Sequence, residues 1–326
     1  MTFGWKAEPV SYAIDGEFRI SRGAKTQVNA IRVTIESGGA VGVGEAVPYS
    51  RFNETIEGSI DDIRRALNAI SEIPTRQDLL QTMRPTAARN ALDAALWDLE
   101  CKRAGISIGD LLPDITITPR TTAYTISADT PEKMHEHALR VRQYPLLKLK
   151  AIGEDDSARL SAVRDARPDA QIILDANEAW DESSFQVIAP LLRSLGVVVL
   201  EQPAPAGQDA FLSPIEGVHI CADESITDMT SISKLSDAYT MINIKLDKTG
   251  GLTHALEMIE YAKRRDLKIM VGCMLGASLS MAPAFIAAQF ADYVDLDGPL
   301  LLKEDNEHPI AYQGAQMQPP SPLLWG

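Results

Sequence analysis

Apolar and polar positions follow two different rhythms along this chain. In the first third, "TQVNAIRVTIESGGAVGVGEAVP" holds two alternating runs around Gly38 and Gly39, and helical spacing follows near 55–71 and from Thr86 to Gly105. Alternation with a period of two on either side of Gly-Gly is typical of a β-hairpin, and apolar residues three or four apart indicate helices. We therefore predict an α+β domain over residues 1–115.

From Thr121 onward, short apolar strands alternate with helical segments. The expected strands are "TAYTIS", "LLKLK", "QIILDAN", "VVVLEQP", "HICADES", "TMINIKL", "KIMVGCM" and "YVDLD". Alternation of this kind implies a parallel sheet, and eight such units close a (β/α)8 barrel, with an open doubly wound sheet as the alternative.

The expected fold class is thus α/β: a (β/α)8-type, modified TIM barrel with an α+β capping domain. We place the barrel at residues 116–301. The tail, 302–326, contains no further strand–helix unit. We expect it to return to the N-terminal third and complete the capping domain.

Composition narrows the class of partner. The chain has 326 residues, 45% of them apolar, and a net charge of −14, which argues against nucleic acid or an anionic membrane as a partner. Cys101, Cys221 and Cys273 form no CxxC pair, so disulfides and structural zinc are not expected. With no signal-peptide pattern and no membrane-length apolar run, we expect a cytoplasmic protein, and a homo-oligomer stays open.

Charged residues recur where the predicted strands end. Five successive strands end at Lys150, Asp175, Glu201, Asp223 and Lys245, and the eighth carries a further acidic pair, "DLD". Their near-constant intervals predict a similar height on each strand. The carboxyl ends of barrel strands are where such folds build active sites.

The segment "LLKLK" leaves two orientations open. Side chains two apart on a strand share a face, so Lys148 and Lys150 point either into water or together into the barrel. Lysine is rarely buried, which favours water for an isolated strand. The charged strand ends downstream favour the inward orientation.

The carboxylates of Asp175, Glu201 and Asp223 suggest a metal site. Acids that converge in a partly desolvated mouth repel one another, and a divalent cation removes that repulsion. Oxygen ligands suit Mg²⁺ or Mn²⁺. Separate surface or helix-capping carboxylates are the alternative.

Lys150 and Lys245 come from strands on opposite sides of the expected barrel. A lysine acts as a base when desolvation or a nearby cation lowers its pKa, and Lys148 supplies that cation. Bases on both faces of one carbon, beside a cation, suit removal and return of a proton next to a carboxylate through an enediolate.

Together these segments resemble the enolase superfamily in its muconate-lactonizing-enzyme subgroup, over essentially the whole chain. The matching motifs are "VGVGEAVPYSRF", "ARNALDAALWDLECKRAG", "KLK", "DAN", "EQP", "ADES" and "IKLDKTGG". The resemblance implies one Mg²⁺ per subunit, held by Asp175, Glu201 and Asp223. It also implies that Lys150 and Lys245 are the acid/base pair and that Lys148 assists Lys150.

The eighth strand helps to choose among subgroup activities. Asp295 and Asp297 resemble the DxD of dipeptide epimerases, which holds a substrate ammonium. The hypothesis is therefore epimerisation of an L-Ala-X dipeptide, with Ala–Glu, a fragment of peptidoglycan, favoured. An o-succinylbenzoate synthase or cycloisomerase, an N-acylamino acid racemase and a metal-free Schiff-base aldolase are the alternatives.

The resemblance extends to residues around the substrate. Phe18 and either Arg22 or Arg19 belong to a lid-like loop, "DGEFRISRGAK", in which the arginine would hold a distal carboxylate. We expect backbone contacts from Cys273 and Leu275, and a contact from Thr125. Many subgroup relatives have Glu directly after the seventh strand, whereas this chain has Gly276. The preference for particular dipeptide side chains therefore stays open.

Overall fold

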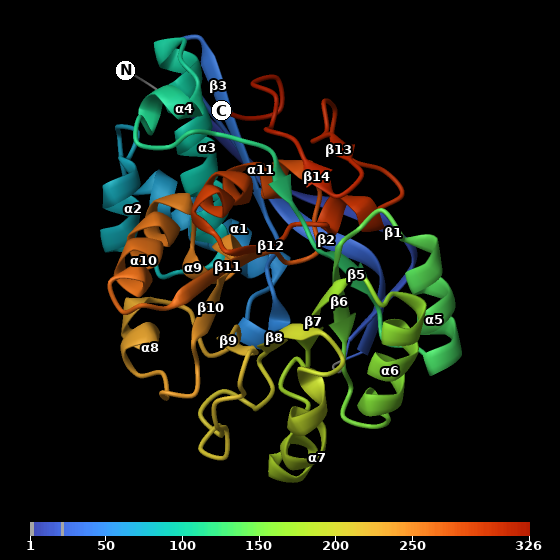
Figure 1. Ribbon diagram of the computed structural model, residues 1–326. Coiled ribbons are helices and arrows are strands. Elements are labelled where there is room, and N and C mark those ends of the chain that lie inside the picture. Colours follow the sequence, from blue (N-terminus) through green and yellow to red (C-terminus); the bar gives the residue numbers. More distant parts are fainter. Residues whose placement is uncertain (1–2, 21–22) are drawn as a thin grey trace.

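The computed structural model describes residues 3–20 and 23–326 (Figure 1). Its N-terminal part is an antiparallel sheet of β1 (Gly4–Ile20), β2 (Gly23–Ser37) and β3 (Ala40–Ala46), in that order. β2 and β3 join at Gly38 and Gly39, whose φ angles of 62° and 81° suit glycine. The predicted hairpin is confirmed.

Helical segments follow this sheet in the chain. They are η1 (Ser50–Phe52), α1 (Ile56–Asn68), α2 (Arg76–Thr82), α3 (Ala87–Ala104) and α4 (Ile108–Leu111), of which α1 and α3 pack on the sheet. α3 begins at a Thr86 cap, whose side chain accepts from Arg89 N, and ends at Gly105 in the left-handed conformation. Its backbone lies directly on Gly44 of β3, where a Cβ atom would overlap Ala91 O and lie 2.6 Å from Ala95 N.

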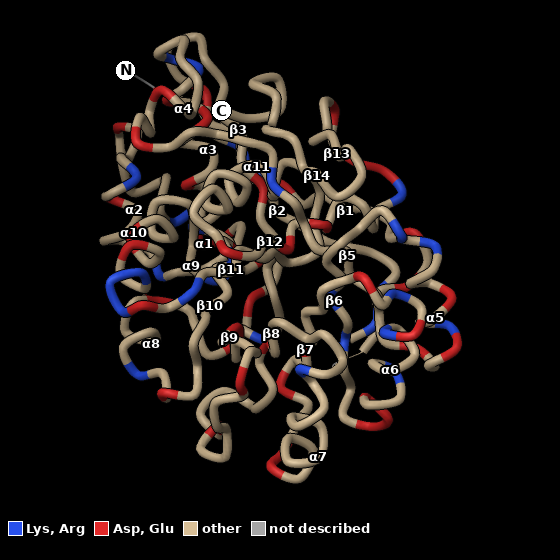
Figure 2. Tube along the Cα trace, viewed as in Figure 1, with Lys and Arg blue, Asp and Glu red and all other residues tan. Residues whose placement is uncertain are grey.

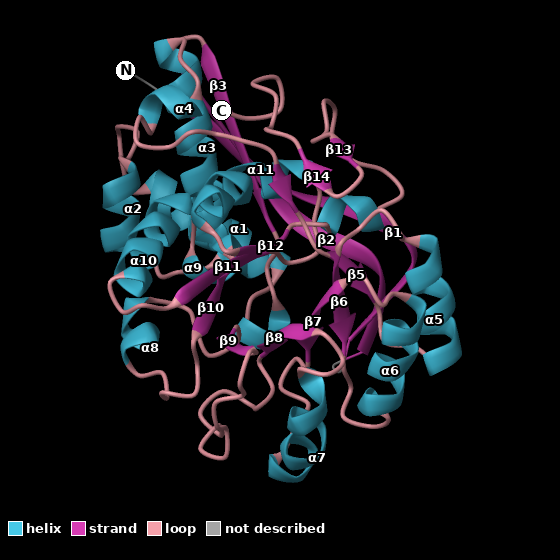
Figure 3. Cartoon of the chain, viewed as in Figure 1, coloured by secondary structure: helices cyan, strands magenta, loops and turns pink. Residues whose placement is uncertain are grey.

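The barrel is formed by eight parallel strands in the part of the chain that the structure describes (Figure 3). They are β5 (Tyr124–Ile126), β6 (Leu146–Lys150), β7 (Gln171–Asp175), β8 (Val197–Glu201), β9 (His219–Ala222), β10 (Met241–Ile244), β11 (Lys268–Gly272) and β12 (Tyr293–Asp295). Ala123 N, just before β5, donates to Val294 O of β12 at 2.8 Å. The first and last strands are therefore neighbours, and the predicted barrel is confirmed.

Helices surround these strands on the outside, as Figure 3 shows for α5 to α7. They are α5 (Pro131–Arg140), α6 (Asp156–Ala166), α7 (Glu182–Leu192), α8 (Met229–Ser233), α9 (Leu246–Thr249), α10 (Leu252–Lys263), α11 (Ser278–Ala287), η2 (Ala288–Phe290) and η3 (Gly298–Leu301). Of the helices that the structure describes, none is long and apolar enough to cross a membrane.

The two faces of β6 differ in what they touch. Leu147 and Leu149 are buried in the outer core, which also holds Leu160 of α6. Leu146, on the opposite face, packs inside the barrel with Ile173, Val199, Cys221, Met241 and Met270. Lys148 and Lys150 share that inner face and are 1% and 6% exposed. The inward orientation of "KLK" is confirmed.

The C-terminal tail contacts the N-terminal part of the chain. β4 (Arg120–Thr121), β13 (Tyr312–Gln313) and β14 (Gln316–Met317) form a small sheet. Beyond it, Trp325 Nε1 donates to Ala94 O of α3 at 2.9 Å, and Gly326 N donates to Asp98 Oδ1 at 2.8 Å. These contacts agree with the predicted return, while the domain boundaries at 115 and 301 stay predictions.

The close approach of α3 to β3 gives a stability prediction. Gly44→Ala should lower the free energy of unfolding by roughly 3 kcal/mol, the upper end for an over-packed core, because the methyl group meets helix backbone. Urea denaturation measures this. Gly109→Ala is the control, since its nearest atom, Ile117 Cδ1, lies at an ordinary 3.4 Å. Equal effects of the two substitutions would contradict the packing argument.

Candidate active site

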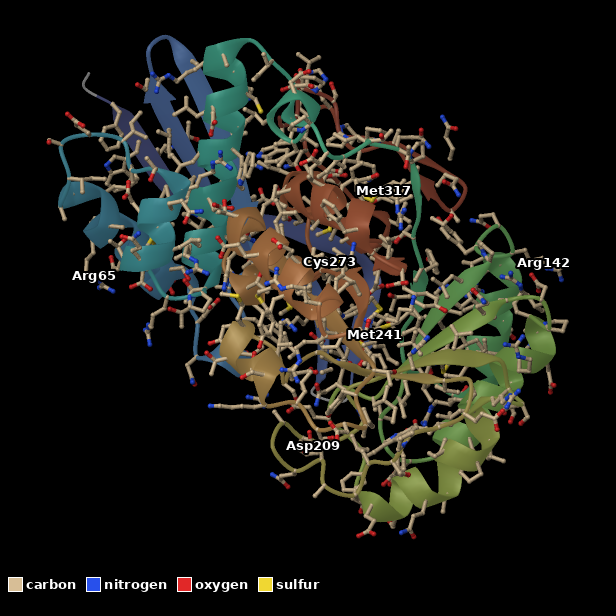
Figure 4. All side chains as sticks on the ribbon, turned by 60° about the vertical axis from the view of Figure 1, so that its left-hand side comes forward. Arg65, Arg142, Asp209, Met241, Cys273 and Met317 are labelled. Carbon is tan, nitrogen blue, oxygen red and sulfur yellow. The ribbon has the colours of Figure 1, made fainter. Side chains whose placement is uncertain are left out.

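A cavity of about 810 Å³ lies between the N-terminal sheet and the mouth of the barrel. One wall comes from β1, β2 and residues 47–56. The other comes from strand ends of the barrel, with Lys150, Asp223 and Lys245 among them. Cys273, which also lines the cavity, lies near the middle of the molecule in Figure 4, whereas Arg65 and Arg142 lie at its periphery.

Lys148 lies beneath this cavity, surrounded by carboxylates. Its Nζ is 2.7 Å from Asp295 Oδ2, 2.7 Å from Glu201 Oε2 and 3.1 Å from Asp175 Oδ2. Burial acts to lower the pKa of Lys148, but these three carboxylates raise it well above its ordinary value. The surrounding carboxylates thus favour the charged form of Lys148 inside the barrel.

The two lysines expected to move protons are each paired with an acid. Lys150 Nζ is 2.6 Å from Asp175 Oδ2, and Lys245 Nζ is 2.6 Å from Asp223 Oδ2. Burial disfavours the charged forms of Asp175, Asp223 and Lys245. Nevertheless Asp223 raises the pKa of Lys245, and the two lysines Lys150 and Lys148 lower the pKa of Asp175.

The sequence analysis missed several polar residues of the site. Lys248 is 3% exposed, contacts the Asp223 carboxylate and donates to Asn243 O at 3.2 Å. It lies almost one helical turn after Lys245, and that spacing was the available signal. Asn243 Nδ2 donates to Glu201 Oε1 at 2.7 Å, and Gln202 Oε1 accepts from Asp223 N at 2.8 Å.

Residues expected around the substrate are brought together in part. Cys273, Leu275 and Phe18 line the cavity, and the Phe18 ring is 5.8 Å from Lys150 Nζ. Arg22 lies outside the described residues. Arg19 does not line the cavity: it is exposed and pairs with Glu17.

The acidic pair of the eighth strand differs from the expectation of two free carboxylates in the mouth. Asp295 binds Lys148, because a buried ammonium needs a counter-charge. Asp297 accepts from Thr125 N at 2.6 Å, and burial together with Asp295 raises its pKa to about 7. Asp295, Asp297 and Thr125 are each about 4% exposed, and none lines the cavity. The substrate-binding role of these three residues stays a prediction.

The predicted metal ligands do not converge as they stand. In the described ranges, no group of three or more His, Cys, Asp or Glu side chains is placed to hold a metal ion, and lysine ammonium groups lie between the carboxylates. The donor set nevertheless fits a hard divalent cation. Asp175, Glu201 and Asp223 are at most 2% exposed, and Asp295 Oδ1 and Asn243 Oδ1 are buried acceptors without a hydrogen-bond partner.

Buried lysines and carboxylates gather at the mouth of this barrel, where barrel enzymes build their active sites. Residues 133–322 match the model described as enolase C-terminal domain-like. Residues 8–113 match the N-terminal domain of mandelate racemase and muconate lactonizing enzyme. The chain therefore belongs to the enolase superfamily, in the mandelate racemase and muconate lactonizing enzyme group, and the predicted resemblance is confirmed.

Known relatives show which kind of enzyme within the superfamily this chain resembles. The chain is 41% identical to an N-acetyl-D-glutamate racemase from Pseudoalteromonas sp over 87% of this chain and 91% of the relative. It is 38% identical to the L-Ala-D/L-Glu epimerase of Escherichia coli K12 over 92% and 94%. A solved enolase family member from Agrobacterium tumefaciens with homology to dipeptide epimerases is 46% identical, with a TM-score of 0.96 over 99% and 100%. It binds sodium and L-Ala-L-Glu. The protein is an isomerase.

One acid of the cavity wall gives a pH prediction. Glu54 accepts from Ala87 N at 3.3 Å, and burial raises its pKa to about 7. Because the folded pKa is raised, the protonated form stabilises the fold, and this stability is lost as pH rises through about 7. Glu54→Gln should therefore gain stability relative to wild type as pH rises from about 4.5 to about 7, and the difference should then stay constant, in urea denaturation. Exposed Glu57→Gln is the control, and the same trend in both variants would refute the assignment.

Proposed function

We propose that this isomerase is a Mg²⁺-dependent epimerase that inverts the α-carbon of the C-terminal residue in L-Ala-X dipeptides, with L-Ala-D/L-Glu preferred. The observation that carries the proposal is the pair Lys150 and Lys245. Lys150 ends β6 and Lys245 follows β10, and three strands separate β6 from β10 on either way around the ring. Both lysines line the cavity, so they approach a substrate from opposite sides.

These lysines are suited to a two-base proton transfer. One removes the α-proton from its face, and the other returns a proton from the opposite face, so the configuration inverts. Lys148, fixed among Asp175, Glu201 and Asp295, supplies positive charge beneath the site. When bound, Mg²⁺ would be held by Asp175, Glu201 and Asp223 and would stabilise negative charge on the substrate carboxylate.

Relatives support this substrate class. The Agrobacterium tumefaciens relative holds L-Ala-L-Glu together with a cation, and the Escherichia coli relative is an L-Ala-D/L-Glu epimerase. Both proteins are matched over almost their whole lengths. Neither of these two relatives is described as a lyase or an aldolase. Cytoplasmic location and oligomeric state stay predictions.

Lys25 is our candidate for the residue that binds the side-chain carboxylate of Glu. Among the described cations of the cavity wall, Lys150, Lys245 and Lys248 each face an acid, and Arg51 makes a bidentate pair with Glu178. Lys25 Nζ instead lies 5.0 Å from the centre of the Tyr49 ring, and no described carboxylate pairs with it. It is therefore available to a ligand anion.

A second candidate is racemisation of an N-acylated amino acid. Asp295 is already neutralised by Lys148 and Asp297 is buried, which weakens the case for an ammonium subsite. N-acetylglutamate lacks the ammonium of Ala–Glu, and the Pseudoalteromonas relative acts on N-acetyl-D-glutamate. The two candidate functions would use the same catalytic residues, and they differ only in whether the site binds a substrate ammonium group.

The test of the reaction is exchange of the α-hydrogen in D₂O. Wild type should exchange and epimerise L-Ala-L-Glu and L-Ala-D-Glu, and a chelator should abolish this until Mg²⁺ is added. Lys150→Ala and Lys245→Ala should each lose epimerisation by about a thousandfold or more, while each still exchanges the one epimer that faces the remaining lysine. Proton NMR follows both signals. Two variants that still epimerise would rule out the two-base mechanism.

The test of the substrate compares two ligands in two variants. Lys25→Glu should lower kcat/KM for Ala–Glu by about tenfold to about a hundredfold, because a charge-assisted contact becomes repulsive. Arg19→Glu, which changes an exposed cation outside the cavity, is the control.

Asp297→Asn should reduce kcat/KM for Ala–Glu far more than for N-acetylglutamate. An equal loss with both ligands would favour the N-acyl racemase.

A further inference from the structure

The turn that carries Lys245 is held by the N-terminal domain. α9 begins directly after Lys245, whose carbonyl accepts from Lys248 N and Thr249 N at 3.0 Å each. Asp247 lies in this turn and is 7% exposed. Its Oδ1 accepts from Val47 N at 2.9 Å and from Asn90 Nδ2 at 3.0 Å. One carboxylate oxygen thus joins the turn to a residue of the cavity wall and to α3.

The far end of the same turn is also fixed by α3. Arg89, which is 3% exposed, donates to Gly250 O at 2.8 Å and to Thr249 O at 2.7 Å. Gly250 has a φ of 72°, and a Cβ atom there would lie 2.6 Å from Arg89 Nε. The turn therefore has little freedom to move while these contacts persist.

The other base is held differently. Lys150 belongs to β6 itself, and its Nζ lies 5.8 Å from the centre of the Phe18 ring of β1. The described backbone hydrogen bonds directly after Lys150 nevertheless stay within the barrel. Ala151 N donates to Asp175 O at 2.8 Å, and Gly153 N donates to Asp156 Oδ2 at 2.8 Å. The two proposed bases are thus supported asymmetrically, Lys150 by the barrel and Lys245 through Asp247.

We propose that Asp247 is a positioning residue that aims Lys245 into the cavity by tying its turn to Val47 and Asn90. The inference rests on the proposed two-base function and deepens it. The domain expected to recognise the substrate also sets the geometry of one of the two bases. Loss of the Asp247 contacts should accordingly impair proton transfer on one face of the α-carbon and spare the other.

A second buried aspartate serves as a control that distinguishes positioning of Lys245 from general packing between the N-terminal domain and the barrel. Asp93 of α3 is also buried and also joins α3 to the barrel, since it accepts from Thr253 Oγ1 at 2.6 Å and from Thr253 N at 3.1 Å. Thr253 lies on α10, beyond the turn that carries Lys245. Asp93 also packs against Gly251, directly after the turn, but it makes none of the hydrogen bonds of Asp247. Asp93→Ala therefore removes a similar pair of hydrogen bonds and leaves those of Asp247 in place.

The experiment measures α-hydrogen exchange in D₂O separately for each epimer of Ala–Glu. Lys245→Ala first identifies the epimer whose exchange depends on Lys245. Asp247→Ala should lower exchange of that epimer by about tenfold to about a hundredfold and change the other by less than about twofold. Asp247→Asn should keep the wild-type ratio, because its amide oxygen accepts the same two hydrogen bonds, and Asp93→Ala should keep it as well.

Three results would overturn the proposal. The first is an equal effect of Asp247→Ala on exchange of both epimers. The other two are a selective loss of exchange of the Lys245-dependent epimer, called the skew below, in Asp93→Ala or in Asp247→Asn. Thermal unfolding is followed for every variant. If Asp247→Ala does not fold, Asn90→Ala removes one of the two hydrogen bonds and must show a skew in the same direction for the proposal to stand.

A readout independent of substrate separates this inference from the proposed function. If wild type exchanges neither Ala–Glu nor N-acetylglutamate, the proposed function fails. The side-chain NMR signals of isotopically labelled lysines then decide the inference, with Lys245→Ala and Lys150→Ala as assignments. Asp247→Ala should shift or broaden the Lys245 signal and leave that of Lys150 unchanged. An unchanged Lys245 signal would refute the positioning role.

Discussion

The burial of the Lys148 ammonium inside a closed ring of strands constrains the rest of the site. Removing such a charge from water costs several kcal/mol unless counter-charges and hydrogen bonds compensate it. Here Asp175, Glu201 and Asp295 provide the compensation from β7, β8 and β12. These three ion pairs connect β6 to β7, β8 and β12, and they hold a group of charged side chains below the cavity. Elsewhere, acidic and basic residues are spread over the outline of the molecule (Figure 2).

The N-terminal domain does more than cover the charged side chains below the cavity. α3 lies so close to β3 that there is no room for a side chain at Gly44. The same helix donates hydrogen bonds from Arg89 and Asn90 to the turn that follows Lys245. Short hydrogen bonds thus connect this helix to the barrel mouth. The inference about Asp247 follows from this continuity, since the chain places one proposed base on the barrel and the other at the interface.

The contacts also bear on what distinguishes relatives that share this fold. Racemases of N-acylated amino acids and epimerases of dipeptides need the same proton chemistry at the α-carbon and differ in how they treat an ammonium group. In this chain one member of the acidic pair, Asp295, neutralises Lys148. The proposed discrimination between the two substrate classes therefore rests on the buried Asp297 and on Lys25 of the cavity wall.

The sequence by itself determined the eight strand units, the inward "KLK" segment and the position of each charged strand end. Local periodicity and the rule that barrel strands present their carboxyl ends at one mouth are enough for that. Only the tertiary structure decided which charges meet. Lys148 and Asp295 are 147 residues apart in the chain, and Asp247 and Asn90 are 157 apart. Pairing over such separations depends on how the ring closes and where α3 docks, because electrostatic contacts follow distance in space and carry no local sequence pattern.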